Sequence, residues 1–164
     1  MTELWDVYNE KRIKTGQTHL RGVPLNVGEF HLVVQIWMVN SCGEVLLTRR
    51  HPEKTYGNLW ECTGGSVLSG EDSLTGALRE VREEVGIALR REDAQLLKSE
   101  RRKQSFYDIW LFHKDFSITE VRLQPEEVTA AKWVTRAIYE DMARQGQIVP
   151  IMTPIYDLYH GPLK

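Results

Sequence analysis

Three glutamates, at positions 80, 83 and 84, stand close together in the middle of this 164-residue chain. Residues spaced i, i+3 and i+4 lie on one face of a helix, so the three carboxylates are expected to lie together. Like charges repel and a solvated helix face usually mixes signs, whereas Mg²⁺ prefers converging oxygen ligands completed by water and substrate phosphates. The spacing therefore predicts a metal site built on Glu80, Glu83 and Glu84.

The surrounding residues predict the helix that would carry these carboxylates. Apolar residues recur at the spacing of one buried helical stripe, at Leu74, Ala77, Leu78, Val81 and Val85. Ser69, with Asp72 three residues on, is the expected N-cap, and Gly86 is the expected stop. We expect a helix over residues 70–85.

Gly76 interrupts this helix one turn before Glu80, where an interior glycine costs about 0.5–1 kcal/mol relative to alanine. Two explanations fit a glycine here. A position without a side chain leaves room for a ligand beside a metal, and it also allows tight packing of the turn. The sequence leaves both open.

The motif around the glutamates resembles the complete signature of the Nudix hydrolases. Seven fixed residue types and two aliphatic positions match: Gly65, Glu71, Arg79, Glu80, Glu83, Glu84 and Gly86, with Val81 and Ile87. From average residue usage, a chance match in a chain of this size is below about one in a million. The resemblance implies a mixed α/β (α+β) fold, the Nudix α/β/α sandwich with a mixed β-sheet, and hydrolysis of diphosphate compounds.

The resemblance also implies roles for the motif residues. In the family, the second and third glutamates of the Arg-Glu-x-x-Glu-Glu run bind metal, and here these are Glu83 and Glu84. The first, Glu80, is a metal ligand or the general base, and the backbone carbonyl of Gly64 is a further ligand. The expected cofactor is Mg²⁺ or Mn²⁺, because breaking a phosphoanhydride requires neutralised phosphoryl oxygens and an oriented water.

Two further motif residues are expected to hold these carboxylates in place. The forked guanidinium of Arg79 can hold two carboxylate oxygens at once. Glu71 is expected close by, bonded either to the site or to Arg79. The predicted catalytic residues are therefore Glu80, Arg79 and Glu71.

Substrate contacts are expected from residues outside the motif. A basic run before the catalytic loop can hold an outer phosphate, and it consists of Arg49, Arg50 and Lys54. Glu126 and Glu127 follow Pro125 in a loop where some family members place an auxiliary carboxylate. Aromatic residues on strands more often belong to the core, but five could offer a stacking surface for a base: Trp37, Tyr56, Phe106, Tyr107 and Trp110.

Residues 6–16, 30–32 and 46–50 are similar to the branch of the family that contains isopentenyl diphosphate isomerases. Those enzymes need a cysteine directly before the first motif glycine, but this chain has Gly64 there and Cys62 two positions earlier. Their catalytic glutamate corresponds at best to Asp108, which is a further candidate auxiliary carboxylate. Cys62 is more often a small core residue than a nucleophile in such a position.

The preferred function is Mg-dependent hydrolysis of a phosphoanhydride in a nucleoside diphosphate linked to another moiety. An isomerase-like enzyme and a non-catalytic Nudix-fold binding or sensor module are the alternatives. Binding modules usually lose motif carboxylates, whereas this chain retains all of them. His31, a single histidine opening an apolar strand, is expected to be structural rather than a metal ligand.

Composition agrees with the small soluble enzyme that the resemblance implies, and the length predicts a single domain over residues 1–164. With 21 basic and 23 acidic residues the net charge is −2, which argues against general attraction to nucleic acid or membranes. Two cysteines do not suggest a disulfide framework, and no signal peptide or long apolar span is evident, which favours the cytoplasm. The expected partner is a small-molecule diphosphate, and a homodimer is left open.

The rest of the chain predicts short strands and two further helices. Apolar and β-branched runs predict strands over residues 31–39, 44–48, 94–103, 105–114 and 128–134. Turn residues at 40–43 predict a hairpin between the first two strands. Thr135 is expected to cap a helix that ends near residue 145 before Gly146, and Pro154 to begin a short terminal helix.

Residues 2–25 are predicted to form an added N-terminal hairpin with a polar turn at residues 9–12. A loosely ordered arm is the alternative. Trp5 and Tyr8 favour the hairpin, because large aromatic side chains are expected to pack.

Overall fold

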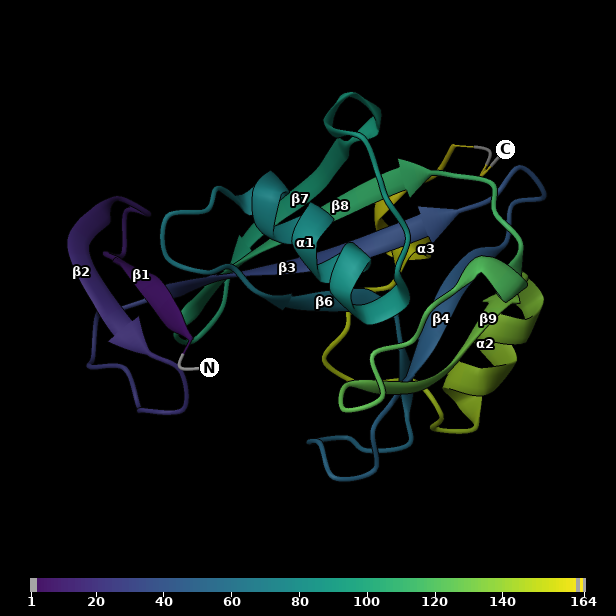
Figure 1. Cartoon of the computed structure of the whole chain (residues 1–164), viewed down its shortest axis with the longest axis horizontal. Helices are drawn as coiled ribbons and strands as arrows, with labels where there is room; N and C mark the ends of the chain where they lie inside the picture. The colour runs from purple at the N-terminus through teal and green to yellow at the C-terminus, as the bar shows by residue number, and fades with distance from the viewer. Residues whose placement is uncertain (1–2, 162, 164) are drawn as a thin grey trace.

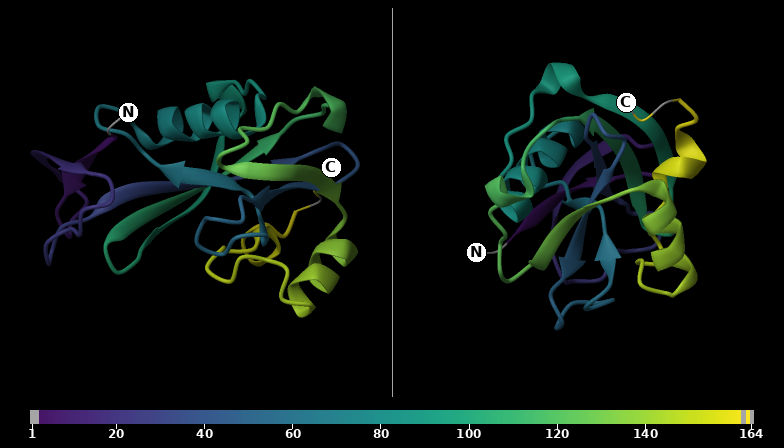
Figure 2. Two further views of the ribbon diagram at one scale, coloured as in Figure 1. Left: turned by 60° about the horizontal axis from the view of Figure 1, so that its bottom comes forward. Right: turned by 90° about the vertical axis from the view of Figure 1, so that its right-hand side faces the viewer.

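A seven-stranded mixed sheet forms the centre of the molecule in the computed structural model, which describes residues 3–161 and 163 (Figure 1). The helix α1 (Ser73–Val85) covers one face, and α2 (Arg136–Arg144) and α3 (Ile155–Leu158) cover the other (Figure 2). This is the predicted α/β/α arrangement. None of the helices among the described residues is both long and apolar enough to cross a lipid bilayer.

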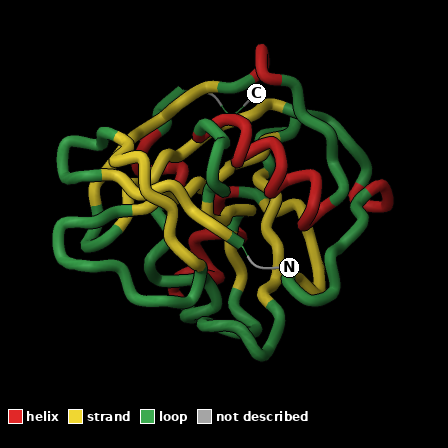
Figure 3. The backbone as a smooth tube through the Cα atoms, turned by 60° about the vertical axis from the view of Figure 1, so that its left-hand side comes forward, coloured by secondary structure: helices red, strands yellow, loops and turns green. Residues whose placement is uncertain are grey.

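Strands and loops make up most of the chain, as Figure 3 shows. The strands are β1 (Leu4–Tyr8), β2 (Lys14–Leu20), β3 (His31–Val39), β4 (Val45–Arg50), β5 (Trp60–Glu61), β6 (Thr63–Ser66), β7 (Gln95–Arg101), β8 (Ser105–His113) and β9 (Val128–Val134). Two short 3₁₀ helices, η1 (Arg91–Asp93) and η2 (Ile118–Glu120), lie in the connections. The five strands predicted after the N-terminal hairpin all form, with ends within three residues of their expected positions.

The predicted hairpin between β3 and β4 holds only at its turn, where Val39 pairs with Val45. Beyond that pair, residues 33–36 of β3 pair with β6, while β4 pairs with β5 and β9. The other edge of β3 runs parallel to β8 along its whole length. The strands diverge because β6 takes the place beside β3 that a simple hairpin would give to β4, and this brings Gly64 and Gly65 to the middle of the sheet.

Alternation along β3 divides the core between the two faces of the sheet. Leu32, Val34, Ile36 and Met38 pack in the cluster that contains the buried stripe of α1, whereas Trp37 and Val39 pack in the cluster under α2 and α3. Alternate residues of a strand point to opposite faces, which explains the division. Each fully buried aliphatic side chain contributes roughly 1.5–3 kcal/mol, so burial of this stripe holds α1 on the sheet.

The start of α1 differs from the expectation. Asp72, not Ser69, is the N-cap, and its side chain accepts a hydrogen bond of 2.6 Å from the backbone N–H of Thr75. The helix begins at Ser73 because Gly70 has a φ of +87°, which a right-handed helix does not allow. In addition, the hydroxyl of Ser69 donates to Oδ1 of Asp6 and does not cap the helix. The stop at Gly86 is as predicted, since this residue has a φ of 72° and its N–H bonds to the carbonyl of Arg82.

Tight packing explains Gly76. A Cβ at this position would lie 2.8 Å from Cγ2 of Val67, so the glycine allows the loop after β6 to lie against the helix. The alternative explanation, room for a ligand, is not needed. The other helix predictions hold, with Thr135 capping α2 and Pro154 preceding α3.

The N-terminal hairpin forms from β1 and β2 and packs against the core. The ring of Trp5 stacks on that of His31 at a centroid distance of 4.0 Å. Nη1 of Arg12, in the turn, donates to Oδ1 of Asp108 on β8 at 2.7 Å. These contacts match the hairpin prediction rather than a loosely ordered arm.

Candidate active site

Arg79 on α1 holds the carboxylates of the motif together. Its Nε donates to Oε1 of Glu71 at 2.8 Å, and its Nη1 donates to Oε1 of Glu80 and Oε2 of Glu83, each at 2.9 Å. Nη2 donates to the backbone carbonyl of Ser66 at 2.9 Å. One guanidinium thus connects α1, β6 and the loop between them, residues 67–72, which we call the catalytic loop. Of the two expected positions for Glu71, the structure has the one bonded to Arg79.

Glu84 is the most deeply buried carboxylate of the motif, with 6% of its surface exposed. Burial raises its pKa well above the ordinary value, and the charges of Glu80 and Glu61 add to this effect. No cation of the described residues lies within ion-pair distance of this side chain. A buried carboxylate surrounded by other carboxylates is unfavourable, so this position favours a bound cation.

The donor set matches a hard divalent ion. The side chains of Glu80, Glu83 and Glu84 line a small cavity of about 70 Å³, together with Gly64 and Gly65. Carboxylate and carbonyl oxygens are the ligands that Mg²⁺ prefers. In this structure Glu80 and Glu83 are bonded to Arg79. Within residues 3–161 and 163, no three His, Cys, Asp or Glu side chains are arranged as ligands around one point. The residues fit the ion by chemistry and burial, and the carboxylates would turn from Arg79 toward it. We call this space the acidic cavity.

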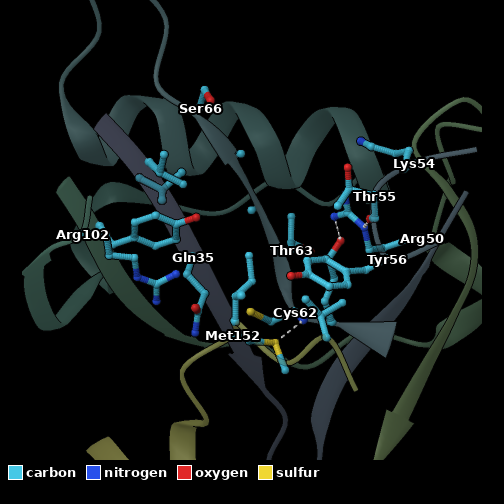
Figure 4. A pocket seen from close by; sticks show the side chains of 18 of the residues that line it. Gln35, Arg50, Lys54, Thr55, Tyr56, Cys62, Thr63, Ser66, Arg102 and Met152 are labelled. Atoms are coloured by element: carbon cyan, nitrogen blue, oxygen red, sulfur yellow. Dashed lines mark hydrogen bonds and ion pairs between the residues drawn. The ribbon is translucent and has the colours of Figure 1, made fainter. Parts of the chain in front are cut away.

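A second cavity, of about 310 Å³, lies beside the acidic one, and we call it the main cavity. Figure 4 shows Lys54 and Ser66 on the side nearer α1, with Cys62 and Met152 at the opposite end. Gln35 and Arg102 lie on one side and Tyr56 on the other. Five residues line both cavities, namely Arg21, Lys54, Gly64, Gly65 and Ser66. The two spaces therefore meet over β6.

The three basic candidates have different positions. Arg50 and Lys54 line the main cavity, and Lys54 also lines the acidic one. Arg49 lines neither, and its Nε donates to the carbonyl of Asn58 at 3.1 Å. Burial lowers the pKa of Lys54, and the charge of Arg50 lowers it further.

Of the candidate auxiliary carboxylates, only Glu127 lines a cavity. It forms an ion pair with Lys54 in the acidic cavity, whereas Glu126 lines neither space. Asp108 lies on β8 outside both cavities, where it accepts hydrogen bonds from Arg12 at 2.7 Å and Ser99 at 2.6 Å. Through Arg12, its carboxylate attaches the turn of the N-terminal hairpin to β8.

Two of the five aromatic candidates reach the main cavity. Tyr56 and Tyr107 line it, and the guanidinium of Arg102 lies 3.6 Å from the ring centroid of Tyr107. Tyr56 has a φ of 58°, uncommon for a residue with a side chain, and such strained positions cluster at functional sites. Of the other three, Trp37 and Phe106 are buried in the core and Trp110 is half-buried against it.

Cys62 and His31 both line the main cavity, where Cys62 is buried and His31 half-buried. Cys62 is 3% exposed, and burial raises the pKa of its thiol well above the ordinary value. The ring of His31 stacks on Trp5, and burial lowers its pKa to about 4. A protonated thiol of this kind is a poor nucleophile.

Sequence reasoning missed several residues that line the main cavity, among them the charged residues Glu61, Arg21 and Arg102. Glu61, on β5, forms an ion pair with Arg50, and burial raises the pKa of Glu61. Arg21 comes from the end of the N-terminal hairpin. The dipeptide Trp60-Glu61, a few residues before Gly65, was a signal for Glu61. No local pattern distinguishes Arg21 or Arg102 from other surface arginines.

Comparisons with known proteins agree with the motif. The family model described as the NUDIX domain matches residues 29–153. The chain is 37% identical over 150 residues to an uncharacterized Nudix hydrolase of Listeria monocytogenes, and the match covers 90% of this chain and 89% of the relative.

Solved structures show the same fold. The crystal structure of DR0079 from Deinococcus radiodurans superimposes with a TM-score of 0.73 at 25% identity, and the match covers 90% of this chain and 92% of that one. The NUDIX domain of Shewanella oneidensis NrtR, solved with ADP-ribose, superimposes with a TM-score of 0.57 at 18% identity over 68% of this chain and 77% of that one.

Proposed function

The chain belongs to the Nudix hydrolase family, and from this premise we propose that it is a Mg²⁺- or Mn²⁺-dependent hydrolase that cleaves a phosphoanhydride bond in a nucleoside diphosphate linked to another moiety. One observation carries the proposal. The acidic cavity and the main cavity meet over Gly64, Gly65 and Ser66. A diphosphate lying over this strand would place its phosphates by the carboxylates and its organic part in the main cavity.

The ion would be held by Glu83, Glu84 and the carbonyl of Gly64, and Glu80 would be either a further ligand or the general base. Once bound, it would neutralise the phosphoryl oxygens and lower the pKa of the attacking water. Before the ion binds, Arg79 orients these carboxylates through its bonds to Glu80 and Glu83. Glu80 is our candidate for accepting the proton of the water, because its carboxylate lies directly against Gly65 at the junction of the cavities.

Residues that line the main cavity would contact the outer phosphate and the organic part of the substrate. Arg50 and Lys54 are the proposed phosphate contacts, since both line the cavity and guanidinium and ammonium groups bind phosphate. Tyr56 and Tyr107 offer aromatic faces for a base. The binding of ADP-ribose by the NUDIX domain of Shewanella oneidensis NrtR supports a nucleotide-sized substrate.

Isomerase chemistry is less well supported. Gly64 occupies the position where the isomerases need a cysteine, and the nearby Cys62 has a buried thiol. Asp108, the counterpart of their glutamate, is bonded to Arg12 outside both cavities. The groups that allylic proton transfer requires are therefore absent or displaced.

The test is a screen of nucleoside triphosphates, nucleotide sugars, ADP-ribose, dinucleotides and isopentenyl diphosphate with Mg²⁺ in ¹⁸O-labelled water. We expect the label in a phosphate product and an unchanged carbon skeleton. A rearranged isoprenoid with unlabelled phosphates would establish the isomerase instead. No phosphate release from any compound would favour a binding module.

A further inference from the structure

The N-terminal hairpin reaches the junction of the two cavities through Arg21, which directly follows β2. Among the described residues, Arg21 and Lys54 are the two cationic side chains that line both cavities. We propose that Arg21 binds the diphosphate of the substrate where the cavities meet. When no substrate is bound, its partner is Glu3. This inference rests on the proposed function and adds the hairpin to the substrate site.

Hydrogen bonds attach the hairpin to the catalytic loop, which fixes where Arg21 lies. Asp6 on β1 accepts from the hydroxyl of Ser69 at 2.7 Å and from the N–H of Gly70 at 3.1 Å. The carbonyl of Leu4 accepts from the N–H of Ser69 at 2.8 Å. Because these residues precede α1 directly, the hairpin and the carboxylate helix are positioned together.

The resting contact of Arg21 is one that a phosphate can replace. Nη1 of Arg21 donates to Oε2 of Glu3 at 2.5 Å, and the two side chains are 50% and 39% exposed. Ion pairs exposed to this extent contribute little to stability. A guanidinium has five N–H donors in a fork that matches phosphate oxygens, so this contact leaves donors available.

The charges at the junction favour an anion. Arg21 and Lys54 approach the same strand, and the charge of Arg21 contributes, after burial and Arg50, to lowering the pKa of Lys54. Two cations that repel each other are stabilised when an anion lies between them. The partner of each is a carboxylate that lines the acidic cavity, Glu3 for Arg21 and Glu127 for Lys54.

The test is calorimetric binding of α,β-methylene-ADP, a nucleoside diphosphate analogue that resists hydrolysis, in the presence of Mg²⁺. We expect Arg21→Gln to weaken binding about tenfold, because it removes a charge-assisted contact to phosphate. Glu3→Gln should tighten binding about two- to threefold, because it releases Arg21. Arg101→Gln is the matched control, an exposed arginine that lines neither cavity, and it should bind like the unmodified protein.

The opposite signs separate substrate binding from a structural role. If Glu3 and Arg21 only anchored the hairpin, both substitutions would weaken binding alike, and this result would overturn the inference. Unchanged binding by Arg21→Gln would overturn it as well. A thermal melt of each variant checks that the fold is intact.

Failure of the proposed function gives a different pattern. If the unmodified protein binds no α,β-methylene-ADP and hydrolyses no compound in the screen, the proposed function fails and the inference falls with it. If it hydrolyses a compound without binding the analogue, the same variants are compared on that compound. Arg21→Gln should then raise KM about tenfold and change kcat less, and an unchanged KM would refute the role of Arg21.

Discussion

Gly65 and Glu80 lie so close together that position 65 has no room for a side chain. A Cβ there would lie 2.6 Å from Oε2 of Glu80, and closer still to its Cδ and Oε1. The glycine is therefore required by the approach of β6 to the carboxylate. Its role differs from that of Gly86, which has a positive φ at the end of α1.

Gly65→Ala should displace the carboxylate of Glu80 without unfolding the protein. The added methyl meets the end of a flexible side chain, so we expect a stability loss below about 2 kcal/mol. Misplacing a catalytic group by about 1 Å costs on the order of a hundredfold, and kcat/KM should fall by about that factor. Steady-state rates and urea unfolding measure the two effects.

Gly76→Ala is the matched comparison for that substitution. Its added methyl meets the buried Val67, so stability should fall by about 1–3 kcal/mol while kcat/KM changes less than about threefold. The account of Gly65 would be contradicted if Gly65→Ala kept full activity, or if the two variants lost activity equally.

Glu84→Gln should make the metal-free protein more stable and abolish activity. The amide removes a buried charge that Glu80 and Glu61 repel, so we expect the melting temperature without metal to rise by about 2–4 °C, which corresponds to about 1 kcal/mol. Mg²⁺ should raise the melting temperature of the unmodified protein and leave that of the variant unchanged. Differential scanning calorimetry with and without Mg²⁺ measures both shifts.

Glu92→Gln, at an exposed position in η1, is the control for that experiment and should change neither stability nor turnover.

Glu83→Gln should also lose Mg²⁺-dependent activity. Turnover that persists in the Glu84→Gln variant, or that needs no divalent metal, would contradict the metal site.

Cys62→Ala should leave catalysis within about threefold of the unmodified enzyme. The side chain of Cys62 is buried and its backbone N–H donates to Sδ of Met152, so the substitution should cost about 1 kcal/mol of stability as a small core deletion. Activity after treatment with iodoacetamide should also persist, because burial raises the pKa of the thiol. A loss of several orders of magnitude in a folded variant would instead support isomerase chemistry.

Arg12→Ala should destabilise the protein in a pH-dependent way. Burial alone would raise the pKa of Asp108, but the hydrogen bonds from Arg12 and Ser99 outweigh it and leave this pKa lowered. The pair therefore contributes fully above the unfolded pKa of about 3.9, and its contribution is lost as the pH falls through the folded pKa. We expect a difference of about 2 kcal/mol near neutral pH that shrinks below about pH 4.

Urea unfolding at several pH values measures this difference. Arg90→Ala, which removes a solvent-screened surface pair with Asp93, should leave stability nearly unchanged at any pH. A difference for Arg12→Ala that stays constant down to low pH would show that the pair contributes through packing and not through charge.

The sequence alone was sufficient for the features that local chemistry controls. Helical periodicity predicts the buried apolar stripe of α1 and the shared face of Glu80, Glu83 and Glu84. The conformational freedom of glycine predicts the end of α1 at Gly86. The strands follow from apolar and β-branched runs. Even here the N-cap was misplaced, because Ser69 and Asp72 are both good caps and the choice depended on a contact between Ser69 and Asp6, 63 residues away.

Only the tertiary structure decided which side chains meet at the site. Glu127 rather than Glu126 faces the acidic cavity, Asp108 is bonded to Arg12 across 96 residues, and Arg21 reaches the junction from the hairpin. The divergence of β3 from β4 likewise depends on the insertion of β6. Periodicity tells which face of an element a residue occupies, but the element that it faces is determined by how the whole chain packs.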